Sequence, residues 1–238
     1  MPVLVGAQED NSGTNPIALT NDFRMIYELQ SWPGDNSYSM TTFQFRAPLM
    51  KNLQFQLKVP IVTMSLGSAP NTYTASGTGD LSARLLTIPY VSQKFALALG
   101  LEGFFSTASQ PDLGTNRNAL GPQVFGVVFN PLGIKGSLIA PAVQQKITID
   151  DESDGPDINQ TLIDLYMVWL APSKKNWFIL DPAMIIDHEQ EIEFAQVELE
   201  IGQMMFGPTS SYVRPGIGVG SDRPLDWNFE MGFKVIWK

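Results

Sequence analysis

The feature that most constrains this chain is an alternation of apolar and polar residues that runs through long segments. In 225–237 every second residue is apolar, and the positions between hold Asp226, Asn228, Glu230, Gly232 and Lys234. Segments 19–30, 53–61 and 196–201 alternate in the same way. Side chains of a strand point to opposite faces in turn, so this period of two predicts strands with one apolar and one polar face.

Turn-forming residues divide the chain into about twelve such strands. They cover 18–31, 37–48, 53–65, 79–90, 94–106, 119–130, 134–149, 159–170, 176–187, 194–206, 210–220 and 224–237. Their length exceeds the roughly 5–6 residues usual in soluble proteins and suits a tilted strand that crosses a bilayer, which needs about 9–11. We therefore expect an all-β fold: a single up-and-down antiparallel transmembrane β-barrel over 17–238. Residues 1–16 are expected to form a flexible N-terminal lead or a partial plug.

The connections between these strands differ by parity. The even-numbered ones are short and hold Lys51, Lys174 and Lys175 but no acidic residue, whereas the odd-numbered ones are longer on average and acidic. Outer-membrane barrels have short periplasmic turns and longer outer loops, so the same division here predicts a bacterial outer-membrane location. The acidic residues that we place in outer loops include Asp150, Asp151, Glu152, Asp154, Glu189 and Glu191.

Tryptophan supports this prediction, and proline complicates it. All five tryptophans fall within a few residues of a predicted strand end, as in the aromatic girdles of membrane interfaces. Pro60, Pro141, Pro182 and Pro215 fall inside predicted strands, where proline cannot donate to the ladder. A closed barrel has no edge strand, so we expect a bulge with a local register change at each of these four prolines.

Composition excludes several classes of protein. The chain has no cysteine, which excludes disulfide scaffolds, cysteine-ligated zinc and thiol catalysis. Its single histidine, His188, leaves little room for histidine-based chemistry, and a net charge of −9 argues against binding to nucleic acid. No run of 18 apolar residues is present to form a transmembrane helix, and the first eight residues are too short for a secretory signal. We expect no cofactor, no metal and no enzymatic activity.

Short motifs that precede several of the strands suggest a family. They are SGTNP at 12–16, GTGDL at 77–81 and NALGP at 118–122, and the closing strand starts with Trp227 and ends in an aromatic residue. In this order they resemble the bacterial outer-membrane proteins of the MetA-pathway of phenol degradation family, some of which carry the label "neuromedin U". The resemblance covers roughly residues 12–238 and implies an outer-membrane barrel that passes small compounds, with aromatic ones as candidates. It carries over no catalytic or binding residues, and Lys238 after the terminal aromatic residue is a small departure.

If the apolar faces of the strands meet lipid, the polar faces line the interior. The expected lumen-lining residues are Arg24, Glu28, Gln44, Arg46, Gln56, Lys58, Arg84, Glu102, Glu198, Glu200, Glu230 and Lys234. So many charges in a dry core would be prohibitive without pairing, so the interior is either a wet path or a polar plug of ion pairs. We favour a channel for passive passage of small solutes, with aromatic or hydrophobic compounds as candidates. The expected partners of this channel are outer-membrane lipid or lipopolysaccharide and the solute.

Other interpretations stay open at this point. A soluble β-sandwich binding module would place the apolar faces in a shared core. A plugged barrel would serve a structural or lipid-handling role, and His188 beside Asp187 would suit a lipid hydrolase if a serine lies within reach. The acidic run that starts at Asp150 resembles a calcium loop, but Thr161 stands where the bidentate glutamate belongs.

Overall fold

The structure is a computed structural model that describes residues 12–67, 70–150 and 155–237. Its strands are β1 (Asn21–Trp32), β2 (Asn36–Met50), β3 (Leu53–Leu66), β4 (Tyr73–Thr78), β5 (Leu81–Val91), β6 (Phe95–Phe105), β7 (Ala119–Phe129), β8 (Ser137–Thr148), β9 (Asn159–Leu170), β10 (Asn176–Asp187), β11 (Ile192–Met204), β12 (Thr209–Val219) and β13 (Trp227–Trp237). The helices of the described residues are two short 3-10 turns, η1 (Pro111–Leu113) and η2 (Pro131–Gly133), and neither is long enough to cross a membrane.

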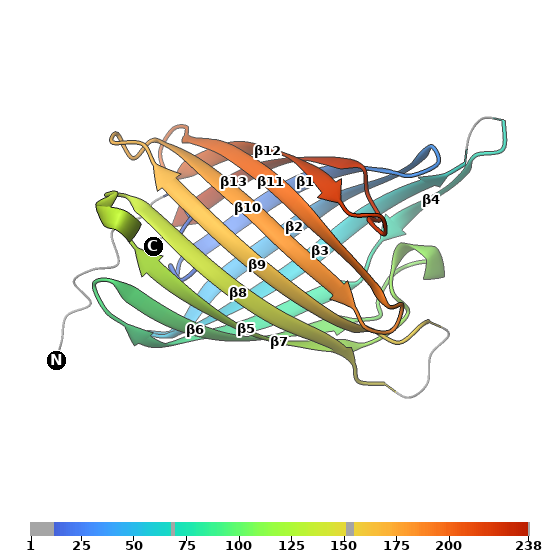
Figure 1. Ribbon diagram of the computed structural model, residues 1–238, viewed down its shortest axis with the longest axis horizontal. Coiled ribbons are helices and arrows are strands. Elements are labelled where there is room, and N and C mark those ends of the chain that lie inside the picture. Colours follow the sequence, from blue (N-terminus) through green and yellow to red (C-terminus); the bar gives the residue numbers. More distant parts are fainter. Residues whose placement is uncertain (1–11, 68–69, 151–154, 238) are drawn as a thin grey trace.

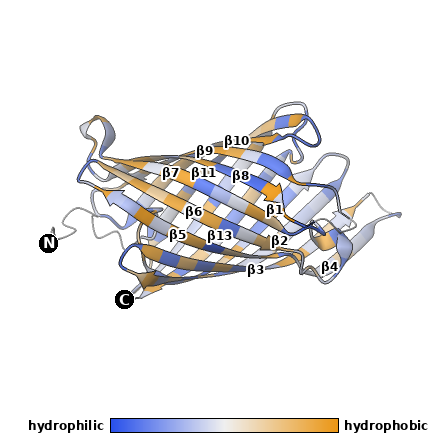
Figure 2. Ribbon diagram, turned by 90° about the horizontal axis from the view of Figure 1, so that it is seen from below, coloured by the Kyte–Doolittle hydropathy of each residue, from blue (hydrophilic) through white to orange (hydrophobic). Residues whose placement is uncertain are grey.

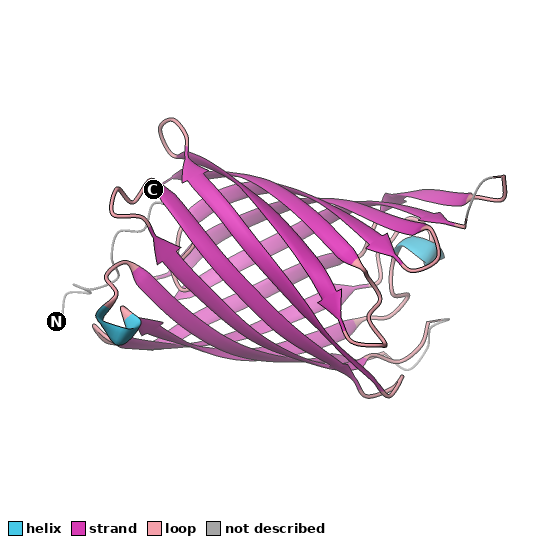
Figure 3. Cartoon of the chain, turned by 45° about the horizontal axis from the view of Figure 1, so that its top comes forward, coloured by secondary structure: helices cyan, strands magenta, loops and turns pink. Residues whose placement is uncertain are grey.

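One antiparallel sheet closes on itself, as Figures 1 and 3 show. β1 pairs with both β2 and β13, which closes the ring. β5 pairs with the first half of β3 and β4 with its second half, so these two strands share one place in a barrel of twelve. The predicted barrel is confirmed and the sandwich is wrong. The predicted strand 79–90 corresponds to β5, and the prediction missed the short strand β4, which Gly79 and Asp80 connect to β5.

The two ends of the barrel differ. β1 begins and β13 finishes at one end, which we call the turn end because its connections are short: 51–52, 92–94, 130–136, 171–175 and 205–208. The opposite end, which we call the loop end, carries the longest connections, 106–118 and 149–158 (Figure 1). The predicted division of connections by length is therefore present in the structure.

Side chains alternate between the outer surface and the interior, and Figure 2 shows the alternation as changes of colour along the strands. On β1, Phe23, Met25 and Tyr27 are exposed on the outer surface, whereas Asp22 is fully buried. Hydrocarbon offers no hydrogen bonds, so a barrel strand with one apolar and one polar face is expected to turn the apolar face outward and the polar face inward. On strands that alternate, such as β1, the sequence pattern therefore sets which face lines the interior.

Register continues unchanged through the four prolines at which we predicted bulges, so those predictions are wrong, whereas register shifts do occur beside Pro48 of β2 and Pro89 of β5. The cross-strand pairs are Pro60 with Thr42, Pro141 with Leu165, Pro182 with Val197 and Pro215 with Phe229. On the other side of each proline the ladder skips bridges or changes partner: β9 and β10 skip two positions at Pro182, and β3 passes from β5 to β4 at Pro60. A bulge would insert one residue and so turn every following side chain to the wrong face. A skipped bridge loses hydrogen bonds only locally and keeps the two faces in place.

The tryptophans divide between the two faces, so the prediction of an aromatic girdle holds for only part of the set. Trp169, Trp227 and Trp237 are exposed on the outer surface near strand ends. Trp177 is fully buried in the interior, where its indole N–H donates to Glu200 at 2.6 Å. Trp32 donates to Gln30 at 2.8 Å and stacks on Tyr38. These two rings turn inward, where an acceptor is available for the indole N–H.

Candidate functional site

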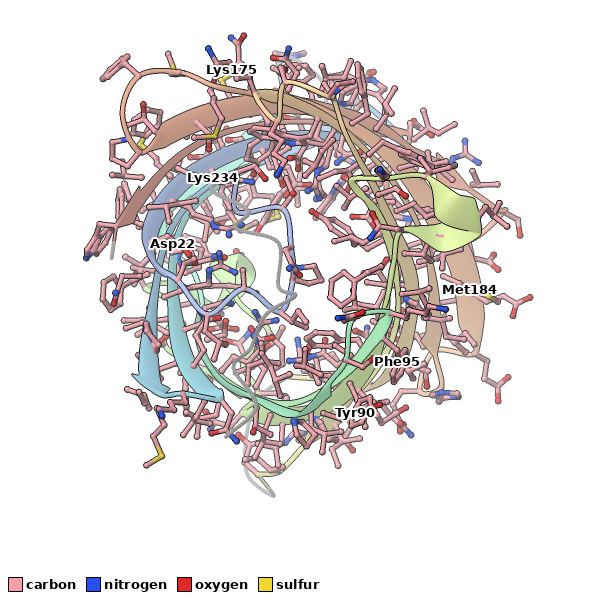
Figure 4. All side chains as sticks on the ribbon, turned by 90° about the vertical axis from the view of Figure 1, so that its left-hand side faces the viewer. Asp22, Tyr90, Phe95, Lys175, Met184 and Lys234 are labelled. Atoms are coloured by element: carbon pink, nitrogen blue, oxygen red, sulfur yellow. The ribbon has the colours of Figure 1, made fainter. Side chains whose placement is uncertain are left out.

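Segment 12–20, which precedes β1, lies inside the barrel. Figure 4, which looks along the barrel, shows a coil of this part of the chain within the ring of strands. Ser12, Thr14 and Ile17 are buried, and the carbonyl of Gly13 accepts a hydrogen bond from Arg24 at 3.2 Å. Gly13 has a φ of +70°, and a Cβ there would meet the side chain of Ile236, so both the backbone and the space favour glycine. Segment 12–20 therefore occupies part of the interior near the turn end.

One wall of the interior is rich in cations. We call it the basic wall and define it as Asp22, Arg24, Arg46, Lys58, Arg84 and Glu102. Asp22 accepts from Arg24 at 2.9 Å and pairs with Arg46 at 2.6 Å, and the Lys58 ammonium lies 3.0 Å from Glu102. The wall thus holds four cations and two carboxylates, which leaves an excess of two positive charges.

A second wall, rich in carboxylates, is formed by side chains of β10 to β13. We call it the acidic wall and define it as Asp181, Glu198, Glu200, Glu230 and the arginine at their centre, Arg214. The Arg214 guanidinium lies 3.4 Å from Asp181 and 3.3 Å from Glu198 and also binds Glu200. Tyr212 donates to Glu230 at 2.6 Å. Four carboxylates around one guanidinium make this wall strongly negative.

Other polar side chains extend this acidic wall. Asn228 donates to Glu198, and its amide lies 3.5 Å from Glu28 on the neighbouring β1. The Lys234 ammonium lies 3.8 Å from Glu200 and over the Tyr212 ring, 4.8 Å from its centre. Lys234 therefore lies between the two walls, and Figure 4 shows it with Asp22 on the inner side of the strands.

A third part of the interior is apolar. Buried side chains of β5 to β10 and β12 form this apolar patch near the turn end, and Ile17 of segment 12–20 packs against them. Its members include Leu86, Phe125, Val127, Leu138, Ala140, Val168, Trp177 and Ile179. The assumption that apolar side chains all meet lipid is therefore wrong for these strands. Segment 176–180, which is apolar at both parities apart from its first residue, carries the signal in the sequence, because a strand buried on both faces loses its alternation.

A cavity of about 270 Å³ lies where segment 12–20, the basic wall and the apolar patch meet. Its cationic lining consists of Arg24, Arg46, Lys58, Arg84 and Arg214. Phe125, Tyr166, Ala140 and Ala142 line it with apolar surface, and Gln44, Gln56, Gln123 and Asp164 complete the polar part of the lining. A polar path for solutes would pass through this part of the barrel.

The twelve residues predicted to line the lumen fall into two groups. Arg24, Gln44, Arg46, Gln56, Lys58 and Arg84 line the cavity. Glu28, Glu102, Glu198, Glu200, Glu230 and Lys234 take part in the interior ion pairs and hydrogen bonds. Sequence reasoning missed Asp22, Gln123, Asp164, Asp181 and, above all, Arg214. The exposed Val213 and Ile217 alternate with Arg214 on β12, so the period of two would have placed it inside.

At the loop end, Asp80 folds the connection 106–118 back over the barrel. Its carboxylate accepts hydrogen bonds from the backbone N–H groups of Thr107, Ala108 and Thr115 and from the Thr115 hydroxyl. Leu113 of η1 then packs on Val62 and Met64 inside the barrel. The connection 106–118 therefore narrows the loop end.

The acidic outer loops have a partly structural role. Asp150 accepts from the backbone N–H and side-chain amide of Asn118, both at 2.8 Å, and lies 3.7 Å from Arg117. The backbone N–H of Asn118 is the main reason that the pKa of Asp150 is lowered from its ordinary value. Glu189 accepts from Asn159 at 3.3 Å, and Glu191 is exposed. Asp151, Glu152 and Asp154 lie outside the described residues. Within the described residues no group of carboxylates or histidine is arranged to hold a metal ion.

His188, the residue on which the hydrolase interpretation depends, lies at the loop end. Its Nε2 is 2.8 Å from the hydroxyl of Thr161, and that hydroxyl donates to Gln145 at 2.5 Å. The neighbouring Asp187 accepts from the backbone of Glu189 and Gln190. The histidine thus faces a threonine whose proton is already donated, an arrangement that does not activate a nucleophile.

Comparisons with known proteins bear on the fold. No family model and no curated protein matches the sequence. Among solved structures, the chain is similar to the COG4313 outer membrane channel from Pseudomonas putida F1, with a TM-score of 0.72 and 11% identity over 92% of this chain and 96% of that one. It is also similar to the KdgM porin (TM-score 0.63, 7% identity, 91% and 99% covered) and the NanC porin (TM-score 0.60, 13% identity, 92% and 99% covered). The chain therefore has the fold of an outer-membrane barrel, and membership of the phenol-degradation family stays an expectation.

Proposed function

We propose that the protein is a channel of the bacterial outer membrane through which small solutes diffuse passively. The observation that carries this proposal is the closed barrel with an apolar outer surface and an interior that holds two charged walls and a cavity beside one of them. Charged side chains at this density need ion pairs, as at Asp22 and Glu200, or water, for which the cavity leaves room. The solved barrels that this fold resembles include porins, which supports the same function.

The interior also suggests which solutes pass. The apolar patch gives part of the path a surface that suits hydrophobic or aromatic compounds. The acidic outer loops and the four carboxylates of the acidic wall raise the local concentration of cations at the mouth and along that wall, whereas the cavity beside the basic wall has the opposite charge. We propose no enzymatic step along this path, and we assign the outer surface to contacts with lipid and lipopolysaccharide.

Segment 12–16 contributes a partial plug in this proposal. Its buried position and the hydrogen bond from Arg24 to Gly13 support this role. Deletion of residues 1–16 is then expected to raise the single-channel conductance without preventing insertion, because residues 12–16 occupy part of the path.

The direct test is the current across a planar lipid bilayer after addition of detergent-refolded protein under a salt gradient. Discrete current steps with a reversal potential that favours cations are the expected result. Inserted protein that carries no current, with or without residues 1–16, would refute the proposal.

A second candidate is a plugged barrel with a structural or lipid-handling role. The observation that favours it is the dense pairing of interior charges, in which Arg214 alone contacts four carboxylates. Silence of inserted protein that resists urea unfolding would favour this candidate over the channel.

A further inference from the structure

The cavity beside segment 12–20 contains one cation that the protein leaves unpaired. Arg24 and Arg46 pair with Asp22, Lys58 pairs with Glu102, and Arg214 pairs with the acidic wall. Among the described residues Arg84 has no ion pair, although it lines the same cavity. We propose that this cavity binds a small organic carboxylate with a flat apolar body, and that Arg84 anchors the carboxylate. This inference rests on the proposed passage of small solutes and names one class of them.

Unused hydrogen-bond donors support an anionic ligand. Arg84 donates from Nη2 to the Gln56 side chain at 2.7 Å, but its Nε is buried without an acceptor among the described residues. The side-chain nitrogen of Gln123, which also lines the cavity, is buried without an acceptor as well. Buried donors normally find a partner, since leaving one unpaired is costly. Oδ1 of Asp164 is a buried acceptor of the same lining without a donor in the described part of the chain, so the unpaired groups are not all donors. A carboxylate in the cavity would suit the Arg84 guanidinium, whose planar fork of donors favours this group.

The charge of the lining points to the same class of ligand. Five cations line the cavity, and Asp164 is the one carboxylate that lines it with them. Arg214 belongs to the same lining, but its positive charge is balanced by the carboxylates of the acidic wall. A cation or a neutral molecule would leave the positive excess of the basic wall uncompensated.

The remaining lining determines the body of the ligand. Phe125 and Tyr166 contribute aromatic surface, and Ala140 and Ala142 are small enough to leave room in front of it. A volume of about 270 Å³ is below the roughly 300–1,000 Å³ of sites for drug-sized molecules, so the ligand has about one ring. An inorganic anion would gain nothing from this apolar side of the cavity.

Benzoate is the probe for this inference, with acetate, benzyl alcohol and benzylammonium as its matched controls. Isothermal titration calorimetry on detergent-refolded protein is expected to show benzoate binding more tightly than all three controls. Acetate lacks the ring, benzyl alcohol lacks the charge and benzylammonium reverses it. Equal affinity for benzoate and benzyl alcohol, or no benzoate binding to protein that conducts, would overturn the inference and leave the proposed channel intact.

Substitution then assigns the anchor. The R84Q variant keeps a donor but is shorter and loses the charge, and it is expected to weaken benzoate binding roughly tenfold to a hundredfold. The K94Q variant removes a charge from an exposed turn and is expected to leave binding unchanged. A normal benzoate affinity in folded R84Q protein would refute the assignment of Arg84. Benzoate binding to protein that never conducts would support the site and refute the channel.

Discussion

Arg214 is the residue whose removal should change the stability of the barrel most. Its guanidinium contacts Asp181, Glu198, Glu200 and Glu230, and Lys234, at 3.8 Å from Glu200, is the cation left nearby when it is removed. Only 17% of the Arg214 side chain and 1% of the Glu200 side chain are exposed, so water compensates little of the loss. Removal of one member of such a buried network costs about 3–5 kcal/mol, and we expect Arg214→Gln to lower the free energy of unfolding by this amount.

The assay is urea unfolding from lipid vesicles followed by tryptophan fluorescence. The matched control is Arg223→Gln, which breaks an ion pair with Asp226 in which both side chains are about 40% exposed. Exposed pairs contribute about 0.2–1 kcal/mol, so this variant should unfold nearly as the wild type does.

A second substitution tests the reason for the effect. Glu200→Gln added to Arg214→Gln removes the most buried of the stranded carboxylates and should restore stability on the order of 1–3 kcal/mol. If Arg214→Gln proved as stable as Arg223→Gln, the interior charges would be fully hydrated and the reasoning would be wrong.

Three further predictions concern other parts of the barrel. Gly202→Ala should cost about 1–3 kcal/mol in the same urea assay, because its Cβ would overlap the Trp177 ring that lies across it. Neutralising Glu198, Glu200 and Glu230 together should lower the preference for cations, and unchanged reversal potentials in bilayer recordings would contradict this. The pKa of Asp150 lies below its ordinary 3.8. The hydrogen bonds that its carboxylate accepts from Asn118 therefore persist above pH 3.8 and are lost only as the pH falls below that value and through the lowered pKa. Digestion of the loop end by an acid protease should therefore accelerate only below that pH, and Asp150→Asn should remove the dependence.

The period of two predicted which side chains point inward because lipid on one side and polar groups on the other impose opposite requirements on alternate residues. Where both faces are apolar, as at Trp177 and Ile179, the alternation disappears. The run 176–180 then indicates an apolar inner face on this strand, but it does not show which other strands contribute to the patch. Lys234 and Glu200 could be placed on the inner face from β13 and β11 separately. Their meeting depends on the relative register of neighbouring strands, which the pattern of one strand does not contain.

Other features were beyond a reading of single strands. At Pro182, β9 and β10 skip two bridges and keep their register, and β10 pairs with β11 without interruption. The pairing of the neighbouring strands determines this outcome, and the proline alone does not predict it. The burial of segment 12–20 depends on Gly13 fitting against Ile236 and Arg24, residues on two different strands. The lone charge of Arg84 emerged only once the partners of the other cations were known.

The central claim is that solutes cross through the interior of the barrel, and the absence of native cysteine allows a direct test. Single cysteines replace Gln56, which lines the cavity, and Phe45, which is exposed on the outer surface of the adjacent β2. Single-channel current is then recorded while a charged, water-soluble thiosulfonate is added. We expect a stepwise drop in current for Gln56→Cys and none for Phe45→Cys. Current that is unaffected at both positions, or blocked equally at both, would contradict a path through the interior.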